Sequence, residues 1–148
     1  MRQPKYDWDE EFGVASCTIF YKDMEFYGQA ACHPNDEDMM SRLVGQTIAE
    51  MRATIWYLRH VRDNELRPQL QALYQLYYNM KHSKKFNPKS YEAKMLYKQI
   101  QLIEKNLDIV KMDIKELYQN LTNYIEQKDL DHQIIKKFRE KKQMVENN

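Results

Sequence analysis

The sequence predicts a mostly α-helical α+β fold in which an N-terminal β-hairpin precedes a long antiparallel helical hairpin or coiled coil. Apolar residues recur at alternating spacings of four and three over residues 96–124, which is the heptad pattern of a helix that packs on a partner helix. Only 3 Gly and 4 Pro occur in 148 residues, and this favours a few long elements. Ahead of the helices, residues 14–21 and 25–32 are rich in β-branched and aromatic side chains, as strands are.

These patterns divide the chain into three regions. Residues 1–35 are expected to hold an N-terminal segment and the hairpin, residues 36–127 the helical hairpin that serves oligomerisation, and residues 128–148 a basic C-terminal helix or tail. The net charge of +1 argues against an acidic DNA mimic and against a uniformly basic nucleic-acid coat. Because no apolar run approaches the ~20 residues of a membrane span and no signal peptide is recognisable, we expect a cytosolic location.

The N-terminal residues 1–13 mix aromatic and acidic side chains. They are too polar for a core strand, although the aromatic rings can attach the segment to the rest of the fold. The two strand-like runs that follow are separated by a short polar break at residues 22–24, which predicts a hairpin. A lone hairpin is marginally stable in water, so it is expected to pack on a helix or to pair with another strand. Cys17 and Cys32 are expected to be reduced, a disulfide being the alternative.

The sequence H-P-N-D-E-D, from His33 to Asp38, is expected to end the hairpin and to begin a helix, since Asn and Asp cap helices and acidic residues suit the first turn. A metal site at His33 is the alternative. The helix is expected to reach Arg67 and to kink or break before Pro68, then to resume as far as Lys81. A loop over residues 83–90 follows, with Ser90 as the cap of the next helix.

The apolar stripe of that next helix is called the heptad seam here and is expected to form the oligomer interface. Its residues are Leu96, Ile100, Ile103, Leu107, Val110, Ile114, Leu117 and Leu121. A second apolar edge lies beside it, formed by Met95, Leu102, Ile109 and Met112. Because one partner helix covers only one stripe, the two together predict a homo-oligomer. After Tyr124 the pattern fails, and residues 128–148 read as a basic amphipathic helix that either docks on the bundle or contacts nucleic acid or a partner.

No sequence motif indicates catalysis. The chain has no phosphate loop, no G-x-G-x-x-G, no H-E-x-x-H and no C-x-x-C, and its four histidines are scattered singly. We therefore expect a protein that is not an enzyme, with no catalytic residues, no cofactor and no resident metal.

Arg52, Trp56 and Arg59 form the most suggestive candidate site. At about 100° per residue they share one helix face, and two guanidinium groups beside an indole can hold a phosphate and stack on a base. The small residues Ala49 and Ala53 either admit a neighbouring backbone or leave space for a ligand. The alternative is that Asp63 pairs with Arg59 while Trp56 covers part of the hairpin.

A second candidate surface surrounds the loop after the first helical arm. Tyrosine and phenylalanine beside lysines are common where proteins meet partners. The predicted partner-binding residues are Tyr78, Lys84, Lys85 and Phe86.

The stretches G-Q-A-A-C-H-P-N-D-E-D (Gly28 to Asp38) and G-Q-T-I-A-E-M-R-A (Gly45 to Ala53) resemble small phage and prophage proteins of Gram-positive bacteria. Residues 14–60 are similar to the strand-then-helix plan of viral anti-defence proteins, the anti-Thoeris sponges in particular. The resemblance implies an oligomer that sequesters cyclic ADP-ribose-type signals. It carries no ligand residues over to this chain.

The sequence and the resemblance together lead us to expect a non-enzymatic, phage-encoded anti-defence binding protein. Such a protein either sequesters a cyclic nucleotide immune signal or, as an anti-CRISPR would, blocks a host immune effector protein. The alternatives are a nucleic-acid-binding accessory protein, ranked lower because the net charge is near neutral, and an oligomeric scaffold without a ligand. No membrane partner is expected.

Overall fold

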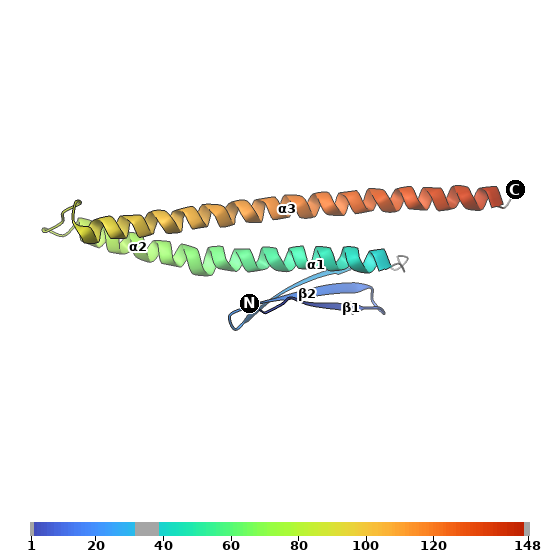
Figure 1. Ribbon diagram of the computed structural model, residues 1–148, viewed down its shortest axis with the longest axis horizontal. Coiled ribbons are helices and arrows are strands. Elements are labelled where there is room, and N and C mark those ends of the chain that lie inside the picture. Colours follow the sequence, from blue (N-terminus) through green and yellow to red (C-terminus); the bar gives the residue numbers. More distant parts are fainter. Residues whose placement is uncertain (1, 32–38, 147–148) are drawn as a thin grey trace. The chain divides into compact units, whose positions relative to one another are not determined.

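The computed structural model describes residues 2–31 and 39–146 (Figure 1). The described chain is mostly helical and carries a small antiparallel sheet near its N-terminus, as the sequence predicts. Its elements are β1 (Lys5–Asp9), β2 (Val14–Tyr21), β3 (Met24–Ala31), α1 (Met39–His60), the π-helix η1 (Val61–Leu66), α2 (Arg67–Lys81) and α3 (Tyr91–Glu146). The expected helix cap and the alternative metal site at His33–Asp38, together with Cys32, lie outside the described residues.

The sheet has three strands in the order β1-β2-β3, so the predicted hairpin is present as β2 and β3 but is extended by β1. Cys17 on β2 is paired with Tyr6 on one side and with Gly28 on the other. The expected pairing of the hairpin with another strand is therefore present, and that strand is β1, at the edge of the sheet. Most of its side chains are exposed, so its polar residues carry no burial cost.

One face of the sheet lies directly on α1. Cys17, Ala49 and Ala53 are fully buried against one another, and Ile19 packs beside them. A β-carbon built on Gly28 would stand 2.1 Å from the carbonyl oxygen of Ala49. The small side chains of α1 therefore admit a neighbouring backbone, which is one of the two uses predicted for them.

The helix does not break before Pro68. It continues from α1 through the six residues of η1 into α2, with Pro68 in the first turn of α2. A proline ring clashes with the carbonyl group four residues earlier in an α-helix, which here belongs to Asn64. The wider turn of a π-helix relieves this clash without ending the helix.

The first part of α3 packs against α2 through a compact apolar core. Leu70 of α2 packs with Leu96, Ile100 and Leu107 of α3, and the Tyr74 hydroxyl donates a hydrogen bond to the Glu104 carboxylate. This part of the chain is hairpin-like (Figure 1). The cap predicted at Ser90 is present, since its Oγ accepts a hydrogen bond from the Ala93 amide at 3.2 Å.

Helix α3 runs without interruption from Tyr91 to Glu146. The basic segment after residue 127 is therefore the last part of α3, and the prediction of a separate C-terminal helix is wrong. The heptad fails at Lys128 and Asp131, yet no Pro or Gly follows. The Lys, Glu and Gln residues there favour helix whether or not their side chains are buried.

The chain divides into two compact units, each described here by itself. One comprises residues 1–54 and 117–148 and contains the sheet, most of α1 and the second part of α3. The other comprises residues 55–116 and contains η1, α2, the loop and the first part of α3.

Candidate functional site

The helix α1 carries Arg52, Trp56 and Arg59 at the spacing that the sequence shows. Arg52 is already engaged, because its Nη1 donates a 2.8 Å hydrogen bond to the backbone oxygen of Gln29 on β3. The Trp56 side chain is 59% exposed. The guanidinium of Arg52 thus fastens the sheet to α1, and a phosphate would compete with that bond.

The space beside Ala49 and Ala53 is occupied. Both residues are 0% exposed, and Gly28 and Cys17 of the sheet lie against them. The argument that these alanines leave room for a ligand is therefore wrong. Their small size serves the contact between the sheet and α1.

The carboxylate of Asp63 forms ion pairs with two arginines on its own helical arm. Arg62 Nε lies 2.8 Å and Arg67 Nη1 2.7 Å from its Oδ1. The hydrogen bond from Arg62 is the first cause of a lowered Asp63 pKa, and the charge of Arg59 adds to it. The predicted pairing of Asp63 with Arg59 is thus present only as this longer-range attraction.

The loop after α2 uses its aromatic residues in two ways. The rings of Tyr77 and Phe86 meet edge to face with centroids 6.3 Å apart, so Phe86 is half-buried and helps to close the loop. Tyr78 is 60% exposed and its ring lies 4.3 Å from that of His82. Lys84 and Lys85 are exposed. Of the predicted partner-binding residues, Phe86 and Tyr78 therefore make ring contacts inside the chain, and Phe86 is the more buried of the two.

The heptad seam of α3 is buried at every second position. Ile100, Leu107, Ile114 and Leu121 are 5–7% exposed, whereas the alternate positions are half-buried. Those half-buried residues are Ile103, Val110 and Leu117. Leu96, at the start of the seam, is 9% exposed. The seam therefore contributes to the core of this chain, and its alternate residues keep part of their surface.

The second apolar edge of α3 is open. Met95 is 37% exposed, Leu102 57%, Ile109 47% and Met112 60%. Each of the first three residues immediately precedes a seam residue, so they form one stripe along the helix. Apolar side chains in such a continuous stripe are typical of surfaces that meet another protein.

Large apolar side chains are also exposed on the last part of α3. Ile134 is 65% exposed, Phe138 68% and Val145 77%. The basic side chains of the same segment, Lys136, Lys137, Arg139, Lys141 and Lys142, are exposed as well. The amphipathic character predicted for this segment is therefore presented at the surface of α3.

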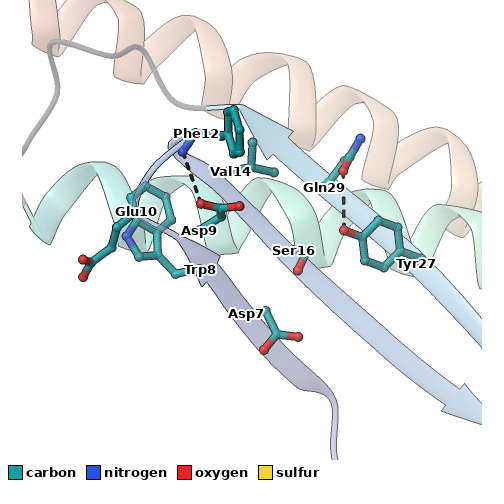
Figure 2. A pocket seen from close by; sticks show the side chains of 9 residues that line it. All are labelled: Asp7, Trp8, Asp9, Glu10, Phe12, Val14, Ser16, Tyr27 and Gln29. Atoms are coloured by element: carbon teal, nitrogen blue, oxygen red, sulfur yellow. Dashed lines mark hydrogen bonds between the residues drawn. The ribbon is translucent and has the colours of Figure 1, made fainter.

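A hollow of about 800 Å³ lies on the outer face of the sheet and on the β1–β2 turn. Figure 2 shows the side chains that line it. The lining consists of Asp7, Trp8, Asp9, Glu10, Phe12, Val14, Ser16, Tyr27 and Gln29. The carboxylate of Asp9 accepts a hydrogen bond from the Phe12 amide at 3.2 Å and so shapes the turn. This hollow is not among the sites predicted from the sequence, although acidic and aromatic residues alternate over residues 6–12.

The opposite face of the sheet holds two groups with raised pKa values. Burial raises the pKa of the Cys17 thiol to about 11, with the Glu50 carboxylate adding to the effect. Burial is also the first cause of a raised Tyr6 pKa, followed by its hydrogen bond to Glu50. A thiol that stays protonated is a poor nucleophile, so Cys17 has a structural role.

Within the described ranges, no group of three or more His, Cys, Asp or Glu residues could hold a metal ion. Among the helices of the described chain, none is both long enough and apolar enough to cross a membrane. Comparison of the chain with protein-family models, with curated proteins and with solved structures finds no match.

Proposed function

We propose that this chain is a non-enzymatic binding protein that acts through the apolar surfaces of α3, as an oligomer that blocks a protein partner. The observation that carries the proposal is the open second edge, in which Met95, Leu102 and Ile109 expose 37–57% of their surfaces. Burying such side chains gains about 25 cal/mol for each Å² of apolar area removed from water. A second copy of the chain, paired along α3 as in a coiled coil, offers the matching stripe.

The phage origin and the anti-defence role rest on the resemblance of residues 14–60 to viral anti-defence proteins. Of the two forms of that role, blocking an immune effector protein is better supported than sequestering a nucleotide. The Arg52 guanidinium is bonded to Gln29, and the space beside Ala49 and Ala53 is filled. Exposed apolar helix surface is suited to a protein partner.

The test of assembly is the mass in solution, measured by light scattering at micromolar concentration. We expect a mass above the 18.1 kDa of one chain. Leu102→Asp with Ile109→Asp should return the mass to that of a monomer with the helical circular dichroism retained, because both side chains are already exposed in one chain. The matched control, Gln101→Asp with Thr122→Asp, adds the same charge at exposed positions about 80° or more around the helix from this stripe and should leave the oligomer intact. A monomeric wild-type protein would contradict the proposal.

The partner class is tested by incubating the purified protein with candidate immune nucleases and, separately, with cyclic nucleotide signals. An effector blocker should co-elute with a nuclease and inhibit it while leaving the nucleotides free. If the protein instead sequesters a nucleotide, calorimetry should detect binding of that nucleotide, and the nucleases should neither co-elute with the protein nor be inhibited. In that case Arg52→Ala should weaken binding by about tenfold or more.

The exposed basic residues at the end of α3 favour one second candidate, a nucleic-acid-binding accessory role. Lys136, Lys137 and Arg139 stand beside the exposed ring of Phe138, a combination that suits phosphates and unstacked bases. Binding to DNA that falls steeply with salt would support this role. Replacing Lys136, Lys137 and Arg139 by neutral residues should then abolish the binding to DNA.

A further inference from the structure

We propose that the hollow on the outer face of the sheet binds the guanidinium group of an arginine presented by a protein partner. This site is separate from the apolar edge of α3, so the inference goes beyond the proposed function and is tested independently of it. It concerns residues 7–29, all within one compact unit.

The first support is the charge of the hollow. Asp7, Asp9 and Glu10 contribute three carboxylates, and no lysine or arginine is among the lining residues. Lys5 approaches Asp7 only loosely, with an Nζ–Oδ2 distance of 3.8 Å and both side chains at least 60% exposed. Such an exposed pair is worth little, so an incoming cation can displace it.

The second support is the aromatic surface between these carboxylates. Phe12 is 71% exposed and Tyr27 47% exposed, and the half-buried Trp8 lies at the rim (Figure 2). The Tyr27 hydroxyl donates a 3.4 Å hydrogen bond to Gln29 Oε1, which holds both side chains on this face. A planar guanidinium can stack on such rings while its N–H groups reach a carboxylate, and a compact ammonium satisfies only part of this arrangement.

The third support is an arginine of the chain itself. The Cζ atom of Arg2 lies 4.1 Å from the centroid of the Phe20 ring. Phe20 alternates with Cys17 and Ile19 along β2, and so it belongs to the same outer face as Val14 and Ser16. This face already holds one guanidinium on an aromatic ring. The hollow offers a comparable ring surface together with the carboxylates that Phe20 lacks.

The occupant is a protein segment because the hollow is open and because its carboxylates are spread over a strand and a turn. Such a surface binds a ligand most tightly when the ligand also contacts the residues at its rim. The probes are three peptides of one design: acetyl-Gly-Arg-Gly-Arg-Gly-amide, its Lys analogue and its Glu analogue. Amide and indole chemical shifts of the full chain report where each peptide binds.

We expect the Arg peptide to shift the resonances of Trp8, Phe12 and Tyr27, and to bind more tightly than the Lys peptide. The Glu peptide should not bind. The variant Asp7→Asn, Asp9→Asn, Glu10→Gln should weaken Arg-peptide binding by about tenfold or more, because charge-assisted contacts are lost. Asn at position 9 keeps an oxygen that can accept from the Phe12 amide, so the turn is preserved.

The matched control removes the same number of charges outside the hollow, through Asp23→Asn, Glu25→Gln and Glu126→Gln, all exposed and in the same compact unit. It should change the affinity less than about twofold, since only screened long-range attraction is altered. Phe12→Ala changes no charge and should weaken binding severalfold. Equal loss in the charge-matched control, equal binding of the Arg and Lys peptides, or no binding of the Arg peptide would each overturn the proposal.

Discussion

The backbone of Gly28 touches the backbone of Ala49, with nothing but van der Waals surface between strand and helix. A β-carbon on residue 28 would lie 2.1 Å from Ala49 O and 2.5 Å from Ala53 N. Both neighbours are backbone atoms of α1, which cannot move aside as a flexible side chain would. The sheet is therefore held at the distance that a glycine sets.

Replacing Gly28 by Ala should destabilise the protein by about 1–3 kcal/mol, the usual cost of overpacking a tight contact. The sheet must move away from α1, which also lengthens the bond between Arg52 and Gln29. Urea unfolding followed by circular dichroism measures the change. Glu25→Ala on the same strand is the control, because its exposed side chain points away from α1; equal loss in both variants would show that the contact is not limiting.

Cys17 should resist thiol reagents in the folded protein. In a Cys32→Ser background, Cys17 is the single thiol of the chain, fully buried and with a pKa raised to about 11. Its reaction with a disulfide reagent at pH 8 should be slow in buffer and become fast in urea, since only unfolding supplies the thiolate. Rapid labelling in buffer would contradict the buried position.

The same thiol predicts lower stability at alkaline pH. A group whose pKa is higher in the folded than in the unfolded state stabilises the fold below its unfolded pKa, and this contribution is lost as the pH rises through its folded pKa. For Cys17 the window runs from about 9 to about 11, and the raised pKa of Tyr6 acts in the same direction. Free energies of unfolding measured at pH 8 and at pH 10.5 should differ less in Cys17→Ala than in the wild type.

The hydrogen bond from Tyr74 to Glu104 should couple α2 to α3. We expect a double-mutant cycle with Tyr74→Phe and Glu104→Gln to give a coupling of about 0.5–1 kcal/mol, small because Tyr74 is partly exposed. The carboxylate also raises the pKa of Tyr74. Glu104→Gln should therefore lower that pKa toward its ordinary value, as read from the phenolate absorbance. An unchanged titration would indicate that the two side chains do not meet in solution.

The π-helix η1 should behave as a single extra residue in the helical arm. Leu58 and Leu70 are twelve residues apart, so an unbroken α-helix would place them about 120° from one another, whereas eleven residues would leave about 20°. Deleting Asn64 in a Pro68→Ala background should therefore keep the apolar stripe of this arm in register and retain the stability of that background. Deleting Gln71 in the same background shifts Leu73 and Tyr77 relative to Leu70 and should lower the unfolding midpoint. If the two deletions lower the unfolding midpoint equally, η1 does not accommodate one extra residue in the helix.

The helical part of this fold could be predicted because its pattern is local. The seam from Leu96 to Leu121 recurs within one helix, and the cap at Ser90 depends on a residue three positions away. The predicted close approach of a backbone at Ala49 and Ala53 is confirmed by Gly28. It was predictable because small residues in a row on one helix face leave room for a neighbouring backbone. What approaches was not predictable from the helix, since Gly28 lies in another element.

The edge strand β1 and the acidic hollow escaped prediction because they depend on pairing between segments. Asp7 lies in a segment too polar for a core strand, and only its pairing with Ser16, and that of Ser16 with Gln29, places it in the sheet. The prediction of ligand space at Ala49 and Ala53 is wrong for the same reason, since the sheet that covers this helix face comes from other segments. The continuity of α3 is not predictable from the heptad, because the pattern reports which face is buried and its loss after Tyr124 does not end the helix.

The pairing of each strand with the next along the chain bears on the order in which the protein forms during its synthesis. β1, β2, β3 and the part of α1 that touches them all lie within the first 54 residues. They can therefore associate while the later helices are still within the ribosome. Short loops cost little entropy to close, and contacts between neighbouring segments form rapidly. Helix α3, with its open apolar edge, follows them in the chain, so that edge emerges after the sheet and the first part of α1 can already have formed.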